Sequence, residues 1–295
     1  MNKTILKWAG SKARAMDTLK MHLPTGHRLV EPFAGSCAVM MNTDYEQYLI
    51  ADVNPDLINM YQQIKNDCEF FMLIASGLFN ASNNNEDTFR RHRFAFNKSK
   101  CIGDVYKAAI FLYLNRHCFN GLCRYNKSGG FNVPFGKYKA PYFPKAEILA
   151  FAEKAQRCTF ICCSFEETLR MAMPGDVVYC DPPYLGNSKT EGFVSYHTAG
   201  FGYVDHEFLA LALRNLSSKG YPVVVSNNHS DRVLALYTGF EIASFDVRRS
   251  VGASADSIKT AREVIASLPA VRDMCSPCNE RYCGNCMHSA GAVVQ

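Results

Sequence analysis

Residues 176–184, Asp-Val-Val-Tyr-Cys-Asp-Pro-Pro-Tyr, carry the clearest structural signal in the sequence. The apolar run in its first half predicts a buried strand over 176–181, and two consecutive prolines, Pro182 and Pro183, prevent that strand from continuing. Asp181 and Tyr184 flank this rigid bend. An acid, a bend and an aromatic ring at the carboxyl end of a buried strand are typical of a ligand site in an open α/β sheet.

The same alternation of strands and helices extends along most of the chain. Apolar residues that recur at three and four positions predict helices over 55–65, 145–154 and 205–216. Short apolar runs predict strands over 27–33, 48–52, 159–163, 176–181, 221–226 and 240–247. Strands alternating with helices indicate an α/β fold whose largely parallel sheet is covered on both faces.

Residues 181–184 suit the methylation of an exocyclic amine on a nucleobase. Such a nitrogen is a poor nucleophile, because its lone pair is delocalised into the ring. The Asp181 carboxylate and the Pro182 carbonyl can accept its two N–H groups and aim the lone pair at a methyl donor, while Tyr184 stacks on the base. The base must leave the duplex to reach this pocket. The structural alternative is a proline turn with Asp181 as a solvated end residue.

A candidate cofactor site follows the first strand, in the small-residue turn of Phe33, Ala34 and Gly35. Small residues let the backbone approach a bound molecule closely. Seventeen residues beyond Gly35, Asp52 ends the next strand, near the ~20-residue offset at which an acid binds ribose hydroxyls in nucleotide-binding folds. The alternative role for Asp52 is to cap the helix that starts near Pro55.

The segment 57–144 interrupts the α/β alternation and differs in charge from the rest of the chain. Within 85–140 there are eleven Lys or Arg and three acids, a net charge of +8, whereas the whole chain carries +5. Basic residues mixed with many aromatic ones indicate a nucleic-acid surface, and a solvated lysine-rich face is the alternative. We therefore predict a catalytic domain formed by 1–56 and 145–268, with an inserted domain over 57–144.

The last part of the chain, 269–295, forms a cysteine-rich tail. Four of the thirteen cysteines lie there with metal-ligand spacing: Cys275, Cys278, Cys283 and Cys286. Four thiolates close a tetrahedral structural site, so we predict one bound zinc ion. An iron–sulfur cluster, a redox pair or a tail without function are the alternatives. The other cysteines are scattered, as expected of reduced thiols in a cytoplasmic protein.

Neither a membrane span nor a signal peptide is predicted. No apolar run approaches the ~18 residues that a spanning helix needs, and the N-terminal stretch is mixed and amphipathic. We expect a cytoplasmic protein that does not contact membranes and is a monomer in solution.

Several motifs in order and spacing resemble the D12-class adenine-N6 DNA methyltransferases, over about residues 2–265. They are 7–12 (Lys-Trp-Ala-Gly-Ser-Lys), 32–35 (Pro-Phe-Ala-Gly) and 181–184 (Asp-Pro-Pro-Tyr). Within that class, 114–126 and 131–136 resemble the Dam-type enzymes, which methylate adenine in GATC. The resemblance implies an α/β fold with a Rossmann-like methyltransferase sheet and an inserted, mainly helical DNA-recognition domain. It also implies that the enzyme uses S-adenosylmethionine and acts on a flipped adenine in double-stranded DNA.

The resemblance also assigns individual residues. It implies that Asp181, Pro182 and Tyr184 are catalytic. For S-adenosylmethionine it implies contacts from Trp8, Lys12, Phe33, Gly35, Asp52 and Asp181. For DNA it implies a reading loop over 119–134, in which Arg124 reads guanine. Around Arg124 it implies that Leu122 and Pro134 touch neighbouring base pairs, that Phe119 and Asn120 pack at the flipped site, and that Lys137 and Arg116 serve phosphates or the surface.

This sequence departs from the family pattern at three places. Phe119 stands where tyrosine is common, residues 251–256 replace a run rich in Gly and Lys, and the cysteine tail has no counterpart. Two alternative functions stay open at this point. A cytosine-N4 methyltransferase would use the same pocket chemistry, and a DNA-binding relative that has lost catalysis would keep the fold.

Overall fold

A computed structural model describes residues 1–99, 104–185, 201–250 and 258–270. The predicted zinc ligands of the tail, and the departure over 251–256, lie outside these residues and stay predictions. Within the described ranges, every helix is too short or too polar to cross a bilayer.

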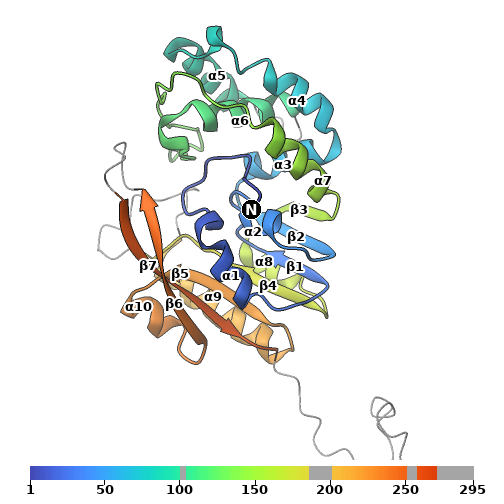
Figure 1. The fold of residues 1–295 in the computed structure, drawn as a ribbon, viewed down its shortest axis with the longest axis vertical. Helices are drawn as coiled ribbons and strands as arrows, with labels where there is room; N and C mark the ends of the chain where they lie inside the picture. Colours follow the sequence, from blue (N-terminus) through green and yellow to red (C-terminus); the bar gives the residue numbers. More distant parts are fainter. Residues whose placement is uncertain (100–103, 186–200, 251–257, 271–295) are drawn as a thin grey trace, which may run out of the picture.

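The described strands form one mixed sheet of seven strands in the order β3-β2-β1-β4-β5-β7-β6 (Figure 1). Its first five strands are parallel, and β7 runs antiparallel to both β5 and β6. The strands are β1 (Arg28–Glu31), β2 (Gln47–Asp52), β3 (Cys158–Cys162), β4 (Asp176–Cys180), β5 (Val223–Asn228), β6 (Glu241–Ser250) and β7 (Ile258–Leu268). The order 3-2-1-4-5 is that of a Rossmann-like sheet, which confirms the predicted fold class.

Helices cover both faces of the sheet because successive strand residues point to opposite sides. On β1, Leu29 packs with α1 (Met16–His22) and α2 (Ala38–Asn42), whereas Val30 packs on the opposite face. That second face carries α8 (Phe165–Arg170), α9 (Tyr203–Ser218) and α10 (Asp231–Leu236). The predicted helices over 55–65, 145–154 and 205–216 are all present, as α3 (Pro55–Asn66), α7 (Lys145–Ala155) and α9.

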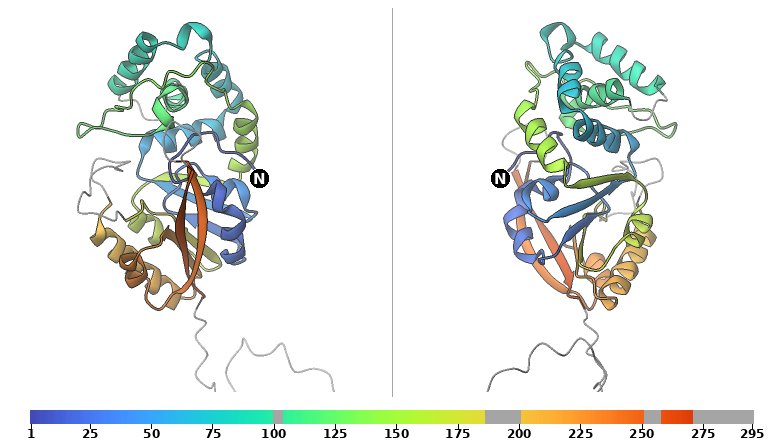
Figure 2. Two further views of the ribbon diagram at one scale, coloured as in Figure 1. Left: turned by 60° about the vertical axis from the view of Figure 1, so that its left-hand side comes forward. Right: turned by 90° about the vertical axis from the view of Figure 1, so that its right-hand side faces the viewer.

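Further helices gather beyond one end of the sheet, as three views show (Figures 1 and 2). They are α4 (Cys68–Ser76), α5 (Glu86–Lys98) and α6 (Val105–His117). Each begins at a polar residue whose side chain accepts a backbone N–H of the first turn, for example Asp67 in α4 and Asn85 in α5. Helix α6 lies at the centre, packed against α3, α4 and α5, and most of its side chains are buried. A helix buried on all sides explains why its sequence shows no amphipathic pattern.

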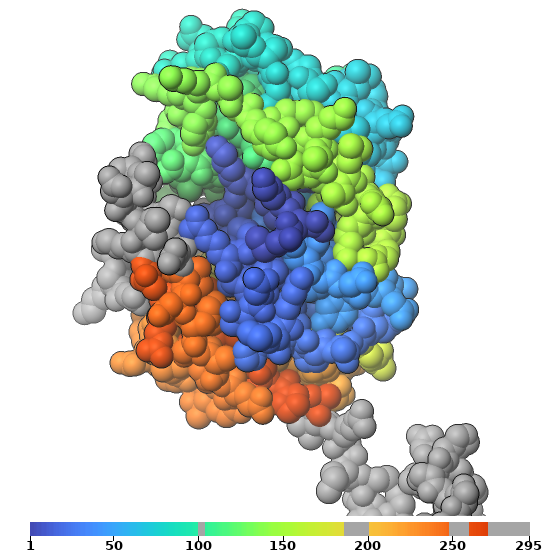
Figure 3. All heavy atoms as spheres, viewed as in Figure 1, coloured from blue at the N-terminus to red at the C-terminus, as the bar shows by residue number. Residues whose placement is uncertain are grey.

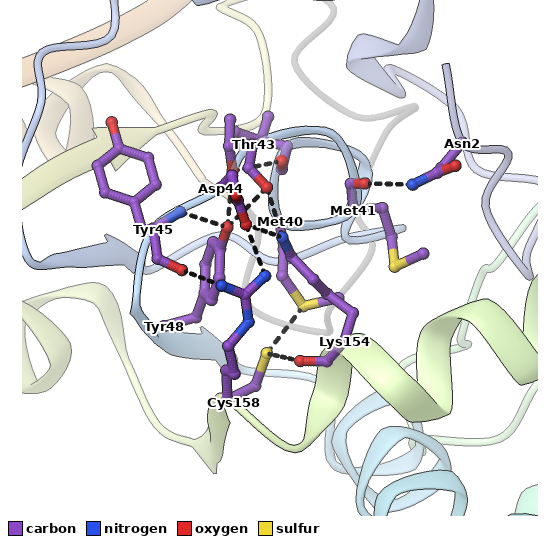
Figure 4. A network of polar contacts seen from close by, with 11 residues as sticks. Asn2, Met40, Met41, Thr43, Asp44, Tyr45, Tyr48, Lys154 and Cys158 are labelled. Atoms are coloured by element: carbon purple, nitrogen blue, oxygen red, sulfur yellow. Dashed lines mark hydrogen bonds and ion pairs between the residues drawn. The ribbon is translucent and has the colours of Figure 1, made fainter.

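The chain returns from these helices to the sheet through α7, where polar contacts hold the junction (Figure 4). Lys154 donates to the carbonyl of Thr43. Arg157 donates to the Tyr45 carbonyl over 2.9 Å and to the Asp44 carboxylate over 2.7 Å. These bonds tie the α7–β3 connection to the loop before β2. They therefore fix where the chain re-enters the sheet as edge strand β3.

Candidate active site

The carboxylate of Asp181 lies at the carboxyl end of β4 and is held from two sides. Its Oδ2 accepts from the Lys12 Nζ at 2.6 Å, and its Oδ1 accepts from the Ser226 Oγ at 3.0 Å. Lys12 begins the short 3₁₀ helix η1 (Lys12–Ala15) and is 5% exposed, whereas Ser226 lies on the adjacent strand β5. Lys12 and Asp181, each predicted separately as a cofactor contact, are thus brought together from distant parts of the sequence.

The ionisation of Asp181 reflects competing effects in this site. Burial raises the pKa of its carboxyl above the ordinary value for aspartate. The Lys12 charge and the hydrogen bonds from Lys12 and Ser226 oppose that rise, while the nearby Glu263 adds to it. The ionised carboxylate, which is the form that accepts two hydrogen bonds, therefore depends on Lys12.

Tyr184 turns its ring toward the same lysine. The Lys12 Nζ lies 4.8 Å from the ring centroid, and the Tyr184 hydroxyl donates to the Glu263 Oε2 at 2.6 Å. Behind Asp181, the Tyr179 hydroxyl and the Ser226 Oγ are 2.8 Å apart. Sequence reasoning missed Ser226 and Glu263. The only available signal for Ser226 was its place at the end of a predicted strand.

The predicted cofactor residues meet at the carboxyl ends of β1 and β2. Gly35 has a φ of +46°, and a Cβ at this position would lie 2.8 Å from the Trp8 Nε1, so only glycine fits this turn. The Gly35 N–H donates to the Asp52 Oδ2 over 3.0 Å. Asp52 does not cap α3, because Asn54 does so by accepting from the N–H groups of residues 56 and 57. The alternative capping role for Asp52 is therefore wrong.

Glu31 is a buried acid beside this cradle, one residue before the motif over 32–35, and no role was predicted for it. It ends β1, is 2% exposed, and its Oε1 has no hydrogen-bond partner among the described residues. Burial and the neighbouring Asp181 raise the pKa of Glu31 to about 8. A buried acceptor without a donor is suited to a cationic or N–H-bearing ligand group. Nearby, Phe33 stacks on Phe165 with ring centroids 5.7 Å apart.

Residues 118–137 follow α6 and form a ribbon of two paired arms, the reading ribbon, which contains the predicted reading loop. Isolated bridges join Cys118 to Phe135 and Tyr125 to Phe131. Arg124 is exposed, and its Nε donates to the Asn132 Oδ1 at 2.8 Å. The other predicted DNA residues of the ribbon lie at least partly exposed on its surface: Phe119, Asn120, Leu122, Pro134 and Lys137.

Arg116 differs from its prediction as a phosphate contact or a surface residue. It is 8% exposed, and its guanidinium donates to the carbonyls of Ile5 and Thr4. The Arg116 Cζ also lies 5.6 Å from the centroid of the Tyr142 ring. Arg116 therefore anchors the N-terminal segment to α6 in this structure. The prediction placed Arg116 at the surface because it lies beside a basic stretch of the sequence. Its burial depends on Thr4 and Ile5, which are more than a hundred positions away.

Known proteins resemble the chain over nearly its whole length. The retron Ec67 DNA adenine methylase of Escherichia coli is 56% identical over 263 residues, which cover 89% of this chain and 90% of that protein. The DNA adenine methylases of Vibrio cholerae and of Escherichia coli K12 are each 42% identical over 265 residues, 90% of this chain and 95% of theirs. The family of D12 class N6 adenine-specific DNA methyltransferases matches residues 8–251. The chain, with its Asp181 site at the end of β4, therefore belongs to the D12 class of N6 adenine-specific DNA methyltransferases.

Proposed function

We propose that this protein transfers the methyl group of S-adenosylmethionine to N6 of a flipped adenine in GATC sites of double-stranded DNA. The observation that carries this proposal is the carboxylate of Asp181, held by Lys12 and Ser226 at the carboxyl end of β4. Strand β4 is the neighbour of β1. The acceptor of an amine therefore lies at the same sheet edge as the Gly35–Asp52 cradle.

The cradle fits S-adenosylmethionine. Asp52 offers a carboxylate for ribose hydroxyls, the turn at Gly35 allows close approach beside Trp8, and the acceptors of Glu31 and Asp181 suit an ammonium group. Phe33 and Lys12 complete the proposed contacts. When bound, S-adenosylmethionine supplies an electrophilic methyl group.

The chain's own groups would prepare the adenine nitrogen for attack. Asp181 and the carbonyl of Pro182 would each accept one N–H of the amine and direct its lone pair toward the methyl group. Tyr184 would stack on the flipped base. Lys12 would keep Asp181 ionised, because its charge opposes the rise that burial causes in the pKa of that carboxyl.

DNA recognition would fall to residues 57–144, and catalysis to 1–56 with 145–268. The exposed position of Arg124 supports guanine reading, and its hydrogen bond to Asn132 holds the planar fork in place. Leu122, Pro134, Phe119 and Asn120 would contact the site, and Lys137 a phosphate. We further propose that the protein acts as a monomer in the bacterial cytoplasm.

The test is to incubate the protein with labelled S-adenosylmethionine and a GATC duplex, digest the DNA and identify the labelled nucleoside. We expect N6-methyladenine, and a duplex of the same composition with a scrambled site should stay unlabelled. Label in N4-methylcytosine would contradict the assignment of the base. No label in either duplex would indicate a binding protein without catalysis.

Arg124→Ala should cost about 1–3 kcal/mol of discrimination at one guanine, because a bidentate contact to its O6 and N7 is lost. Binding to random duplex should change little. The control is Lys127→Ala, which removes an exposed cation of the same ribbon. Competition binding with each guanine of the site replaced in turn measures the effect. An equal loss of affinity for all duplexes would make Arg124 a phosphate contact instead.

A further inference from the structure

Glu263 is a buried carboxylate that no motif marks. It lies on β7, opposite Asn228 of β5 and Phe245 of β6, and is 4% exposed. Both neighbouring strands fix its backbone in register. Burying a carboxylate is costly unless strong hydrogen bonds hold it. One of those bonds comes from the Tyr184 hydroxyl, with 2.6 Å between the two oxygens.

The hydroxyl of Tyr184 is not needed for stacking itself. A phenylalanine ring offers the same face to a base, so the hydroxyl must serve another purpose. A hydrogen bond at the para position fixes the far end of the ring, and Lys12 lies 4.8 Å from the ring centroid. The two prolines before Tyr184 restrict its backbone, and the hydrogen bond to Glu263 restricts the far end of its ring.

We propose that Glu263 is a positioning residue that holds the Tyr184 ring in the orientation in which it stacks on the flipped adenine. This proposal rests on the proposed role of Tyr184 as the stacking surface. The antiparallel strand β7 thereby contributes to a site whose other groups come from β4, β5 and the N-terminal segment. The connected groups are Glu263, Tyr184, Lys12, Asp181, Ser226 and Tyr179.

Two variants remove the same hydrogen bond from its two ends, Glu263→Ala and Tyr184→Phe. Each should lower kcat about 10- to 100-fold, because a loosely held base spends less time in the reactive geometry. The KM for DNA should stay within about twofold, since the contacts to the duplex lie elsewhere. Glu263→Gln keeps an acceptor for the hydroxyl and should restore kcat to within about threefold of the native value.

A duplex with 2-aminopurine in place of the target adenine reports stacking directly, because its emission falls when the base stacks. We expect higher emission from the complexes of Glu263→Ala and Tyr184→Phe than from the native protein, and native emission from Glu263→Gln. The matched control is Glu241→Ala, which removes an exposed carboxylate from β6, the strand beside β7, at the end of the sheet away from the site. It should leave kcat, emission and Tm unchanged.

The double variant Glu263→Ala with Tyr184→Phe should be no worse than either single variant, because both remove one interaction. Additive losses would overturn the proposal, as would native kcat and emission in Glu263→Ala. If Glu263→Ala does not fold, native kcat and emission in Tyr184→Phe overturn it equally.

Tyr184→Ala separates this proposal from the function on which it rests. Full activity of Tyr184→Ala would refute the stacking role itself, whereas its inactivity beside a normal Glu263→Ala would refute only the role of Glu263.

Discussion

Asp181→Ala is expected to lower methyl transfer by about a thousandfold or more while leaving the affinity for GATC duplex within a few-fold. The carboxylate accepts from Lys12 and Ser226 in the free protein, and its interaction with the amine strengthens only as the nitrogen is attacked. An interaction made in the transition state affects kcat rather than binding. Single-turnover transfer of labelled methyl groups and equilibrium DNA binding measure the two quantities.

Asp181→Asn and Asp17→Ala complete this experiment. The amide preserves the shape of Asp181 but not its charge, so it should be nearly as inactive, whereas Asp17 is an exposed acid on α1 whose loss should have no effect.

In the native protein, kcat should fall as the pH falls through the raised pKa of Asp181, because protonation removes an acceptor. Near-normal turnover of Asp181→Ala would remove this residue from the mechanism.

Asn115→Ala is expected to destabilise the protein by about 2–4 kcal/mol, the largest effect on stability that we predict. Asn115 lies on α6 and is fully buried. Its amide accepts from the Lys7 N–H over 2.9 Å and donates to the carbonyls of Lys7 and Gly121 over 2.8 and 3.0 Å. Truncation leaves three backbone groups, each at least partly buried, without this partner. The Tm should fall by about 5–10 °C.

The N-terminal residues that Asn115 holds, dark blue in Figure 3, lie between the green residues of the helical end and the lighter blue residues that follow them along the chain. Its release should also weaken binding to GATC duplex, because Gly121 belongs to the reading ribbon. Asn215→Ala on the exposed face of α9 is the control and should stay within about 0.5 kcal/mol of the native protein. An unchanged Tm for Asn115→Ala would show that other groups hold this junction.

The strands that carry the site could be predicted because their signals are local. The run before Asp181, the turn at Gly35 and the acid at Asp52 each depend on neighbours within a few residues, where apolar periodicity and proline geometry are sufficient. The structure confirms those strands and adds their order in the sheet. Strand β7 escaped prediction because its residues 258–268 mix charged and apolar types, and pairing on both sides stabilises it.

From local sequence patterns we could infer the α/β class, the site motif at Asp181 and the family resemblance. The folded structure was needed to show that Ser226 and Glu263 join the site, that Glu31 is a buried acid with a raised pKa, and that Arg116 is internal. These two sets of features differ in how far apart in the sequence the interacting residues lie. Strand and turn formation depends on neighbours along the chain, whereas burial, hydrogen bonding and ionisation depend on groups that the fold brings together from distant positions.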